Sequence, residues 1–410
     1  MIQPKIFIYL LITVFFNSAY LLPQNFIHTE GRNIVDGNGN IIELKGINLG
    51  NWLVPEGYMF KFKKTNSPLL IDKVINEMVG PGKAKSFWKE YRDNYYTLDD
   101  IKFVKDCGLN SIRVPFNYRL FVLEGPENKW INTGFEMLDR VIKWCEEENI
   151  YVILDMHCAP GGQTGDNIDD SFGYPFLMVD EYAQDLITQV WEKIAERYKD
   201  NRIVLGYDLM NEPIAHYFED ENLQSRLEPL YRKITAAIRA VDQNHIIILG
   251  GARWNTDFSV FSEPFDPNLV YEFHKYWCDT TQTEIQEYVD FRDKYNVPIW
   301  MGESGENTYE WISAWRRLME KNDIGWCFWP LKRLDTDRSL LSITEPEDFN
   351  KIIEFAELPR NTFKEIRENR PPIEISYGLL KAYLKNIRFD KCTVNKGYLK
   401  ALGLEYHSRL

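Results

Sequence analysis

The sequence has few cysteines, and they lie far apart. The 410 residues contain six: Cys107, Cys145, Cys158, Cys278, Cys327 and Cys392. No two of them have the close spacing that is typical of zinc sites. Several fall within apolar runs, so we expect buried free thiols. The sequence alone does not fix any disulfide pairing.

Positive charge is also scarce. Lys and Arg number 48 against 61 Asp and Glu, which gives a formal net charge of −13 at pH 7. Nucleic-acid binding depends on basic surface that neutralises phosphates. The composition therefore argues against a nucleic-acid partner and favours a neutral or cationic substrate.

Long apolar runs are absent too. Residues 6–16 are apolar, but this run is shorter than the roughly 20 residues that a transmembrane helix needs. With the small and polar residues at 17–19 behind it, the run predicts a signal peptide over residues 1–22 and a secreted or periplasmic protein. An uncleaved anchor is the alternative, although no cysteine near the junction could carry a bacterial-type lipid anchor. We expect no stable membrane insertion.

The chain has no Ser- or Pro-rich linker and no tandem repeat. We therefore expect residues 23–410 to form one large domain, without a separate carbohydrate-binding module. A hydrophobic content of 44% is enough for a substantial core. The many aromatic residues, among them 12 Trp and 23 Tyr, suit either the apolar faces of sugar rings or the core of a large α/β protein.

Apolar segments of strand length recur along the chain. They span residues 44–49, 111–116, 151–157, 204–212, 246–251, 269–276, 298–303 and 325–331. Segments with helical spacing lie between them, for example Phe135 to Cys145, Leu186 to Ile194 and Leu227 to Ile238. Eight alternating β and α units predict an α/β fold, a single closed (β/α)8 TIM barrel.

Three further segments flank the barrel units. A turn signal at residues 36–40 predicts a β-hairpin within residues 26–43 that plugs the bottom of the barrel. Long loops are expected after strands 1 and 8, at residues 56–96 and 334–370, and we expect both to lie over the catalytic face. Residues 377–387 read as the closing helix and residues 390–410 as a short tail.

Two of the apolar segments end in a glutamate. One runs into Asn211-Glu212-Pro213, where proline cannot continue a ladder, so we expect that strand to stop at Glu212. The other ends in Gly302-Glu303. Active-site residues of parallel barrels come from the carboxyl ends of the strands, so both carboxylates are expected at one mouth. Paired carboxylates are the minimal apparatus for glycoside hydrolysis, whereas a single Asn-Glu-Pro more often only opens a turn.

Together with these glutamates, the strand motifs resemble glycoside hydrolase family 5, the cellulase-type group of retaining barrel enzymes, along nearly the whole mature chain. Leu44 to Gly50 is similar to its first strand and Ser111 to Pro115, with Arg113, to its second. The remaining matches are Asp155-x-His157, Asn211-Glu212-Pro213, His274-x-Tyr276, Gly302-Glu303 and Trp329.

The resemblance implies Glu212 as acid/base and Glu303 as nucleophile, with no metal or organic cofactor. It implies that Arg113 keeps Glu303 ionised and that Tyr276 donates a hydrogen bond to Glu303. Asn211 would bind the sugar 2-hydroxyl and Trp329 would stack under the reacting ring. His157 and His274 complete the set, although each histidine taken singly could be a core residue. Asp208, Cys158 and Glu306 are interpreted as structural.

Two further runs, Leu49 to Glu56 and Asp155 to Gly165, resemble the exo-β-1,3-glucanase branch of the family. In that branch the position of Glu56 grips the terminal sugar. We therefore expect a secreted enzyme that cleaves β-glucosidic bonds in an oligo- or polysaccharide, with exo action. The alternatives are a hydrolase of β-mannan, glycolipid or furanoside substrates on the same fold, or a non-catalytic exported sugar-binding protein.

Overall fold

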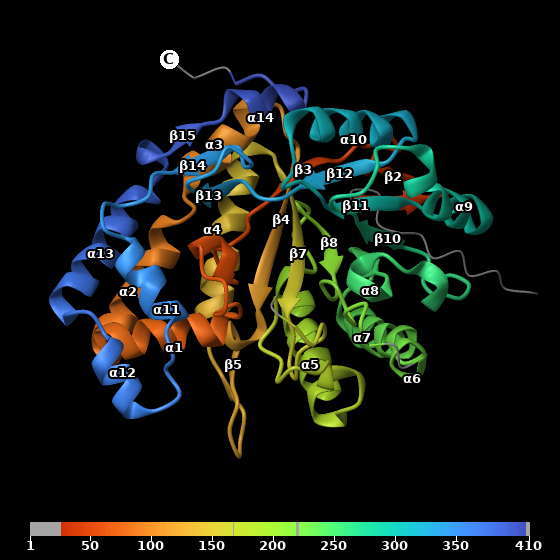
Figure 1. Ribbon diagram of the computed structural model, residues 1–410. Helices are drawn as coiled ribbons and strands as arrows, with labels where there is room; N and C mark the ends of the chain where they lie inside the picture. The colour runs from red at the N-terminus through yellow and green to blue at the C-terminus, as the bar shows by residue number, and fades with distance from the viewer. Residues whose placement is uncertain (1–25, 167, 219–220, 407–410) are drawn as a thin grey trace, which may run out of the picture.

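The computed structural model describes residues 26–166, 168–218 and 221–406, so the predicted signal peptide lies outside the described residues. Eight parallel strands form a closed barrel (Figure 1). In order around the barrel they are β3 (Lys45–Asn48), β4 (Ser111–Asn117), β7 (Tyr151–Cys158), β8 (Val204–Asp208), β9 (Ile246–Gly250), β10 (Leu269–His274), β11 (Ile299–Glu303) and β12 (Gly325–Phe328), and β12 pairs with β3. The predicted TIM barrel is confirmed.

The barrel strands are apolar on both faces because each face is covered. Alternate residues of β9 divide between two cores: Ile246 and Ile248 fill the barrel interior, whereas Ile247 and Leu249 face the surrounding helices. A strand buried on both sides carries a continuous apolar run rather than an alternating one. The sequence segments therefore identify the strands well.

The N-terminal hairpin is present and closes the bottom of the barrel. Its strands β1 (His28–Glu30) and β2 (Asn33–Val35) are antiparallel, and Ile27 and Ile34 pack into the barrel-interior core. The turn between β1 and β2 lies at Gly31, where φ is +56°. The turn predicted at residues 36–40 is confirmed as well, because Val35 and Ile41 form an antiparallel bridge across it. Residues 36–40 form a second turn, which the Asp36 carboxylate stabilises by accepting hydrogen bonds from Asn38 and Asn40.

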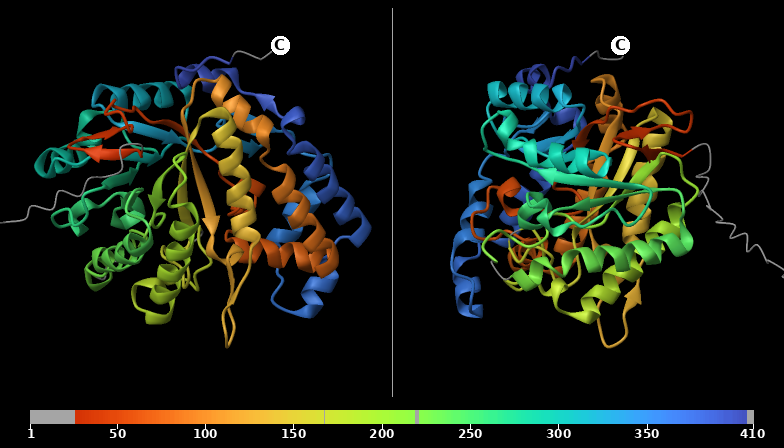
Figure 2. Two further views of the ribbon diagram at one scale, coloured as in Figure 1. Left: turned by 180° about the vertical axis from the view of Figure 1, so that it is seen from behind. Right: turned by 90° about the vertical axis from the view of Figure 1, so that its right-hand side faces the viewer.

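Helices surround the barrel, and Figure 2 shows α3 and α4 (orange and yellow) on its back. The helices after β3, β4, β7, β8, β10, β11 and β12 are α3 (Leu98–Asp106), α4 (Thr133–Glu148), α5 (Glu181–Tyr198), α7 (Leu227–Val241), α9 (Gln286–Tyr295), α10 (Tyr309–Lys321) and α13 (Ile373–Asn386), whereas β9 is followed only by a short helix and a 3-10 turn. The helices predicted from apolar spacing, α4, α5 and α7, are confirmed. In α7 the spaced residues Leu227, Leu230, Ile234 and Ile238 form the buried face.

The two long connections follow the first and eighth barrel strands as predicted, but much of their length is helical, and most of it does not lie over the catalytic face. The first contains α1 (Pro68–Val79) and α2 (Pro81–Asn94), and the second contains α11 (Asn350–Glu357) and α12 (Phe363–Asn369). Helices α1, α2 and α11 pack with α13 at the side of the barrel (Figure 1). The apolar faces of these helices must be buried against a partner. Most of the two connections therefore forms an extra layer beside the barrel instead of covering the strand ends.

Short elements complete the fold. They are β5 (Val122–Leu123), β6 (Lys129–Trp130), α6 (Glu221–Gln224), α8 (Ala252–Asn255), β13 (Lys332–Leu334), β14 (Leu341–Ile343), β15 (Thr393–Val394) and α14 (Lys396–Ala401), with single 3-10 turns between them. β15 pairs with β14, which anchors the predicted tail.

All six cysteines are free, as expected, with Cys278 and Cys392 partly exposed. Within the described ranges no helix combines the length and apolar character needed to cross a membrane.

Candidate active site

A cavity of about 580 Å³ opens at the carboxyl ends of the barrel strands. Its volume falls within the roughly 300–1,000 Å³ that is usual for small-molecule sites. Seven of the nine residues predicted for the site line it: Glu56, His157, Glu212, His274, Tyr276, Glu303 and Trp329. The other two, Arg113 and Asn211, are fully buried beneath it.

The two glutamates reach this cavity from different local structures. Glu303 is the last residue of β11. The prediction that the fourth strand stops at Glu212 is wrong, because β8 ends at Asp208. The chain then turns, with the Asn211 amide bonded to the Met156 carbonyl, and Glu212 adopts a left-handed φ of 45°.

The two carboxylates face each other. One carboxylate oxygen from each glutamate and a His274 ring nitrogen all lie within 4.8 Å of one another. Glu212 is 9% and Glu303 5% exposed, so both acids meet the cavity with little water around them. At this separation a single small group could contact both carboxyls at once.

A buried guanidinium sets the charge of Glu303. Arg113 contacts a Glu303 oxygen through Nη1, and its Nε donates to Asp208 over 2.7 Å. Burial raises the pKa of Glu303, but the charges of His274, Arg113 and His157 outweigh burial and hold it below its usual value. Tyr276 donates a further hydrogen bond to the other Glu303 oxygen at 3.1 Å. Arg113 therefore acts beneath the cavity and not on its wall.

The pKa of Glu212 is shifted in the opposite direction, to a higher value. Burial raises its pKa above the usual value, the nearby charge of Glu303 adds to this effect, and the hydrogen bond from His274 only partly offsets it. Nδ1 of His274 lies 2.8 Å from a Glu212 oxygen, and Nε2 contacts Glu272. Burial lowers the pKa of His274, yet the carboxylates of Glu303, Glu212 and Glu272 raise it to about 10. The imidazole is therefore protonated at neutral pH and donates from both nitrogens.

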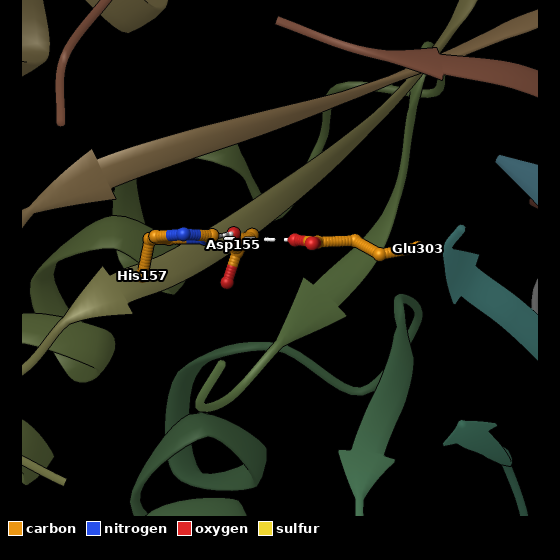
Figure 3. Close-up of side chains that lie close together, drawn as sticks. All are labelled: Asp155, His157 and Glu303. Atoms are coloured by element: carbon orange, nitrogen blue, oxygen red, sulfur yellow. Dashed lines mark hydrogen bonds and ion pairs between the residues drawn. The ribbon is translucent and has the colours of Figure 1, made fainter. Parts of the chain in front are cut away.

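His157 lies on the other side of Glu303 from His274. Figure 3 shows His157 on β7 and Glu303 on β11 directed toward each other, with Asp155 beside them. Nδ1 of His157 lies 2.7 Å from Asp155 and 3.9 Å from Glu303. Burial lowers the pKa of His157, but Asp155, Glu303 and Glu56 raise it to about 9. The ring stacks on Trp329 with centroids 5.5 Å apart.

Glu56 borders the same part of the cavity. Its Oε1 lies 4.0 Å from Nε2 of His157 and has no hydrogen-bond partner among the described residues. Burial raises the pKa of Glu56 to about 8, and the charge of His157 opposes this rise. The indole N–H of Trp329 is already occupied, since it donates to the hydroxyl of Tyr58 at 2.5 Å. A ligand with hydroxyl groups would satisfy the free oxygen of Glu56.

The model of the cellulase family, glycosyl hydrolase family 5, matches residues 71–334, which is well over half of the chain. The chain belongs to glycoside hydrolase family 5. It is therefore a glycoside hydrolase, and the family resemblance seen in its strand motifs is confirmed.

Individual relatives of this family 5 enzyme act on several substrates, according to their names. A β-xylosidase from Phanerodontia chrysosporium is 30% identical over 345 residues, which cover 75% of this chain and 71% of that protein. Endoglucanase C from Acetivibrio thermocellus is 24% identical over 61% of this chain and 88% of its own. A probable glucan 1,3-β-glucosidase A from Aspergillus clavatus is 24% identical over 52% of each chain.

Solved structures share the barrel. An endogalactoceramidase superposes with a TM-score of 0.61 over 92% of this chain and 84% of its own, at 14% identity. Cel5A from Thermotoga maritima, solved with cellobiose, gives a TM-score of 0.53 over 88% of this chain and 97% of its own, at 19% identity. At these identities the likeness establishes the fold alone.

Sequence reasoning quoted Asp155 in a motif but gave it no role in the family 5 site, and it missed Glu272. Asp155 and Glu272 contact the site histidines, and both lie two residues before their histidine on the same strand. Residues at i and i+2 of a strand point to the same face, so the Asp-x-His and Glu-x-His spacings were the available signal. The cavity residues Trp254 and Trp277 gave no such signal, because they lie in loops whose path the sequence does not fix.

Two groups of side chains have the composition of metal sites. They are Asp155, His157 and Glu303 (Figure 3), and Glu212, His274 and Glu303. Within each group the histidine already bonds to a carboxylate of the same group, His157 to Asp155 over 2.7 Å and His274 to Glu212 over 2.8 Å. Arg113 already supplies a cation to the shared Glu303. These donor sets suit an ion-pair network better than a metal centre.

Proposed function

We propose that this enzyme hydrolyses β-glucosidic bonds with retention of configuration, with Glu303 as nucleophile and Glu212 as acid/base. The observation that carries the proposal is the approach of the two carboxylates, with oxygens within 4.8 Å and pKa values shifted in opposite directions. Retaining enzymes place these groups about 5–5.5 Å apart, whereas inverting enzymes leave about 6.5–9.5 Å for a water.

Each step follows from the charges in the site. Glu303, kept anionic by Arg113, attacks the anomeric carbon while protonated Glu212 gives its proton to the departing oxygen. Glu212 then lacks its proton and can activate the water that releases the sugar from Glu303. Tyr276 positions the nucleophile through its hydrogen bond. Asn211, held by Arg113 at 2.9 Å, is proposed to bind the sugar 2-hydroxyl.

We propose further that the enzyme removes terminal sugars. Glu56, His157 and Trp329 gather on one side of the cavity, and the unpartnered Glu56 oxygen suits a hydroxyl of a chain-end sugar. With a pKa of about 8, the Glu56 carboxyl is protonated at neutral pH and can both donate and accept. The named activity of the glucan 1,3-β-glucosidase relatives supports a terminal β-glucosyl substrate.

A β-xyloside is the second candidate substrate, because the relative with 30% identity is named a β-xylosidase. Kinetics with 4-nitrophenyl β-glucoside, β-xyloside and β-mannoside, together with laminarin, cellulose and mannan, separate the candidates. Turnover of the glucoside and release of single glucose units from laminarin are expected. Preferred cleavage of mannan or of internal bonds contradicts the proposed sugar or the exo action.

The decisive experiment replaces the nucleophile. Glu303→Ala is expected to abolish turnover of an aryl β-glycoside, and added azide is expected to restore part of it by taking the place of the missing carboxylate. Glu127→Ala, an exposed glutamate on the β5–β6 hairpin, is the matched control. NMR of the first product formed by the wild type should show the β-anomer. Full activity of Glu303→Ala, or the α-anomer as first product, would reject the mechanism.

The proposal includes export of the enzyme. The signal peptide over residues 1–22 and the single catalytic domain over residues 23–410 remain predictions from the sequence. Mass spectrometry of the protein from a secreting host tests both: we expect a mature chain that begins between residues 20 and 25, and an intact N-terminus would contradict cleavage.

A further inference from the structure

The loop that carries the proposed acid has a strained backbone. After β8 ends at Asp208, Glu212 and Ile214 both adopt left-handed conformations, with φ of 45° and 57°, on either side of Pro213. This region is unfavourable for residues other than glycine, and most of all for a β-branched residue such as isoleucine. Such a conformation persists only where surrounding contacts fix it. The contacts that fix this loop therefore also decide where the carboxyl of Glu212 points.

Gln163, in the loop after β7, holds both ends of this left-handed turn. Its side-chain Nε2 donates to the main-chain carbonyl of Asn211 over 2.9 Å and to that of His157 over 2.8 Å. Its Oε1 accepts from the main-chain N–H of Ala159 over 3.0 Å, and its own main-chain carbonyl accepts from Ile214 over 2.9 Å. One glutamine therefore ties the acid's loop to the end of β7.

Thr164 holds the backbone of Glu212 itself. Its hydroxyl donates to the main-chain carbonyl of Glu212 over 2.8 Å, and its own main-chain carbonyl accepts from the N–H of Ala215 over 3.1 Å. Thr164 and Gln163 are both fully buried, and neither is one of the residues that line the cavity. The two side chains therefore act on the backbone of the acid's loop and not on the substrate.

The position of Thr164 is in turn fixed by Asp169. Both oxygens of this buried carboxylate accept main-chain hydrogen bonds, Oδ2 from Thr164 over 2.6 Å and from Gly165 over 3.3 Å, and Oδ1 from Ser171 over 2.9 Å. Gly165 has φ of +86°, and a Cβ there would lie 2.5 Å from the ring of Phe218. The loop after β7 is therefore closely packed, and it can hold the acid's loop in one conformation.

His274 orients the carboxyl of Glu212 at its tip, over 2.8 Å. This hydrogen bond aims the acid only if the backbone that carries the side chain is fixed as well. The same backbone carries Asn211, whose side-chain oxygen accepts from Arg113 over 2.9 Å. A misplacement of about 1 Å in a catalytic group can cost roughly 10²-fold in rate. The proposed chemistry therefore depends on support for the backbone at residues 211 and 212.

We propose that Gln163 and Thr164 are positioning residues, which set the left-handed turn at Glu212 and so aim its carboxyl at the oxygen of the scissile bond. Thr164 acts on the acid, because its hydroxyl holds the Glu212 carbonyl. Gln163 acts on the acid and on the proposed 2-hydroxyl contact together, because its amide holds the Asn211 carbonyl. The inference rests on the proposed role of Glu212 as acid/base.

Kinetics with two leaving groups test the role of Thr164. Thr164→Val keeps the shape of the side chain and removes its hydroxyl. For the phenyl β-glycoside of the best sugar from the substrate panel, kcat/KM should fall roughly 10- to 100-fold, because a misplaced acid gives its proton poorly. For the 2,4-dinitrophenyl β-glycoside, whose leaving group departs without a proton, the fall should stay below about 3-fold. Equal falls for both substrates, or no fall at all, overturn the inference.

Two further variants separate positioning from a general defect. Thr164→Ser keeps a hydroxyl and should recover most of the activity that Thr164→Val loses. Thr235→Val, on α7, removes a buried hydroxyl that has no hydrogen-bond partner among the described residues, and it should leave both substrates unaffected. A Thr164→Ser variant as impaired as Thr164→Val contradicts the role given to the hydroxyl.

Gln163→Met should instead weaken the turnover of both substrates. It removes the side-chain hydrogen bonds to the Asn211 and His157 carbonyls at nearly constant length, so the proposed contact with the sugar 2-hydroxyl is displaced together with the acid. We expect kcat/KM to fall at least about 10-fold for the 2,4-dinitrophenyl glycoside as well. Normal kcat/KM for that substrate would overturn the role given to Gln163.

A double-variant cycle separates this inference from the proposed mechanism. If Thr164 acts through the acid, Thr164→Val in the Glu212→Ala background should lower kcat/KM for the phenyl glycoside by less than about 2-fold. A full additional loss in that background shows a general structural role and overturns the inference. Equal losses for both leaving groups in Glu212→Ala alone overturn the proposed function. A selective loss in Glu212→Ala with none in Thr164→Val overturns only the positioning role.

Discussion

Nδ1 of His274 donates a hydrogen bond to Oε1 of Glu212 over 2.8 Å, which joins the end of β10 to the loop after β8. Glu212 lies outside any strand, so this bond, and not a sheet ladder, orients its carboxyl in the cavity. The same ring nitrogen is 3.8 Å from Glu303. One imidazolium therefore acts on both proposed catalytic carboxyls.

Removal of the acid should affect poor leaving groups most. Glu212→Ala is expected to reduce kcat/KM for an oligosaccharide by roughly 10²- to 10⁴-fold, because the departing alkoxide then leaves without a proton. An activated aryl glycoside needs little assistance and should lose far less. Steady-state kinetics with 2,4-dinitrophenyl glucoside and laminaribiose give the comparison. Equal losses for both substrates would contradict the acid role.

The pH profile of kcat/KM should be bell-shaped. The charges of His274 and Arg113 hold the pKa of Glu303 below its usual value, so the nucleophile becomes protonated and activity is lost only at unusually acidic pH. Burial holds the pKa of Glu212 above its usual value, so activity falls again as rising pH removes the proton that the acid must give. The two limbs report apparent values of the coupled pair. A profile without a basic limb for an unactivated substrate would contradict the assignment.

His274→Asn should move both limbs of that profile to higher pH. The positive charge of His274 lowers the pKa of Glu212 and of Glu303, so its removal lets both values rise. His28→Asn, on β1 at the opposite end of the barrel, is the control and should leave the profile in place. A shift of the limbs in opposite directions would show that His274 does not act on the two acids through its charge.

Arg113→Met should destabilise the fold strongly. Arg113 is completely buried and pairs with Asp155, Asp208, Glu272 and Glu303, so its loss leaves buried carboxylates unpaired, at a cost of about 3–5 kcal/mol. Without this charge the pKa values of Asp155 and Asp208, already raised by burial, rise further. Carboxyl groups with raised pKa values bind protons more readily in the folded state than in the unfolded state. The loss in free energy of unfolding caused by Arg113→Met should therefore shrink as the pH falls.

Urea unfolding at pH 7 and pH 5 measures this loss in the free energy of unfolding. Arg197→Met, which removes a half-exposed pair with Asp139, is the matched control and should cost about 0–1 kcal/mol at either pH. A deficit for Arg113→Met that is as small as the control, or that grows toward pH 5, would contradict the role given to the buried guanidinium.

Gly302→Ala tests how closely the site is packed. A Cβ on Gly302 would come within 1.8 Å of a Glu272 oxygen, so Glu272 or β11 must shift, and Glu303 is the next residue. Overpacking of this kind costs about 1–3 kcal/mol, and we expect a large loss of kcat as well. Gly378→Ala, in open space on α13, should instead stabilise the protein by about 0.5–1 kcal/mol. Thermal unfolding and turnover of both variants check the contrast.

The sequence by itself determined the barrel and much of the site. Apolar runs identify the strands because each strand is buried on both faces, and a strand end such as Glu303 must lie at the barrel mouth in any closed parallel sheet. Motif resemblance brought in Glu56, Tyr276 and Trp329, which line the cavity as side chains from loops or strand ends.

Only the tertiary structure decided the properties that depend on distance. The approach of Glu212 to Glu303, the ion pairs that join Arg113 to four carboxylates, and the two tryptophans of the cavity wall bring together segments far apart in the chain. Charge interactions and ring contacts act over a few ångströms, and such proximity is created by barrel closure. Local sequence patterns specify strands and helices, but they do not encode which loops meet above them.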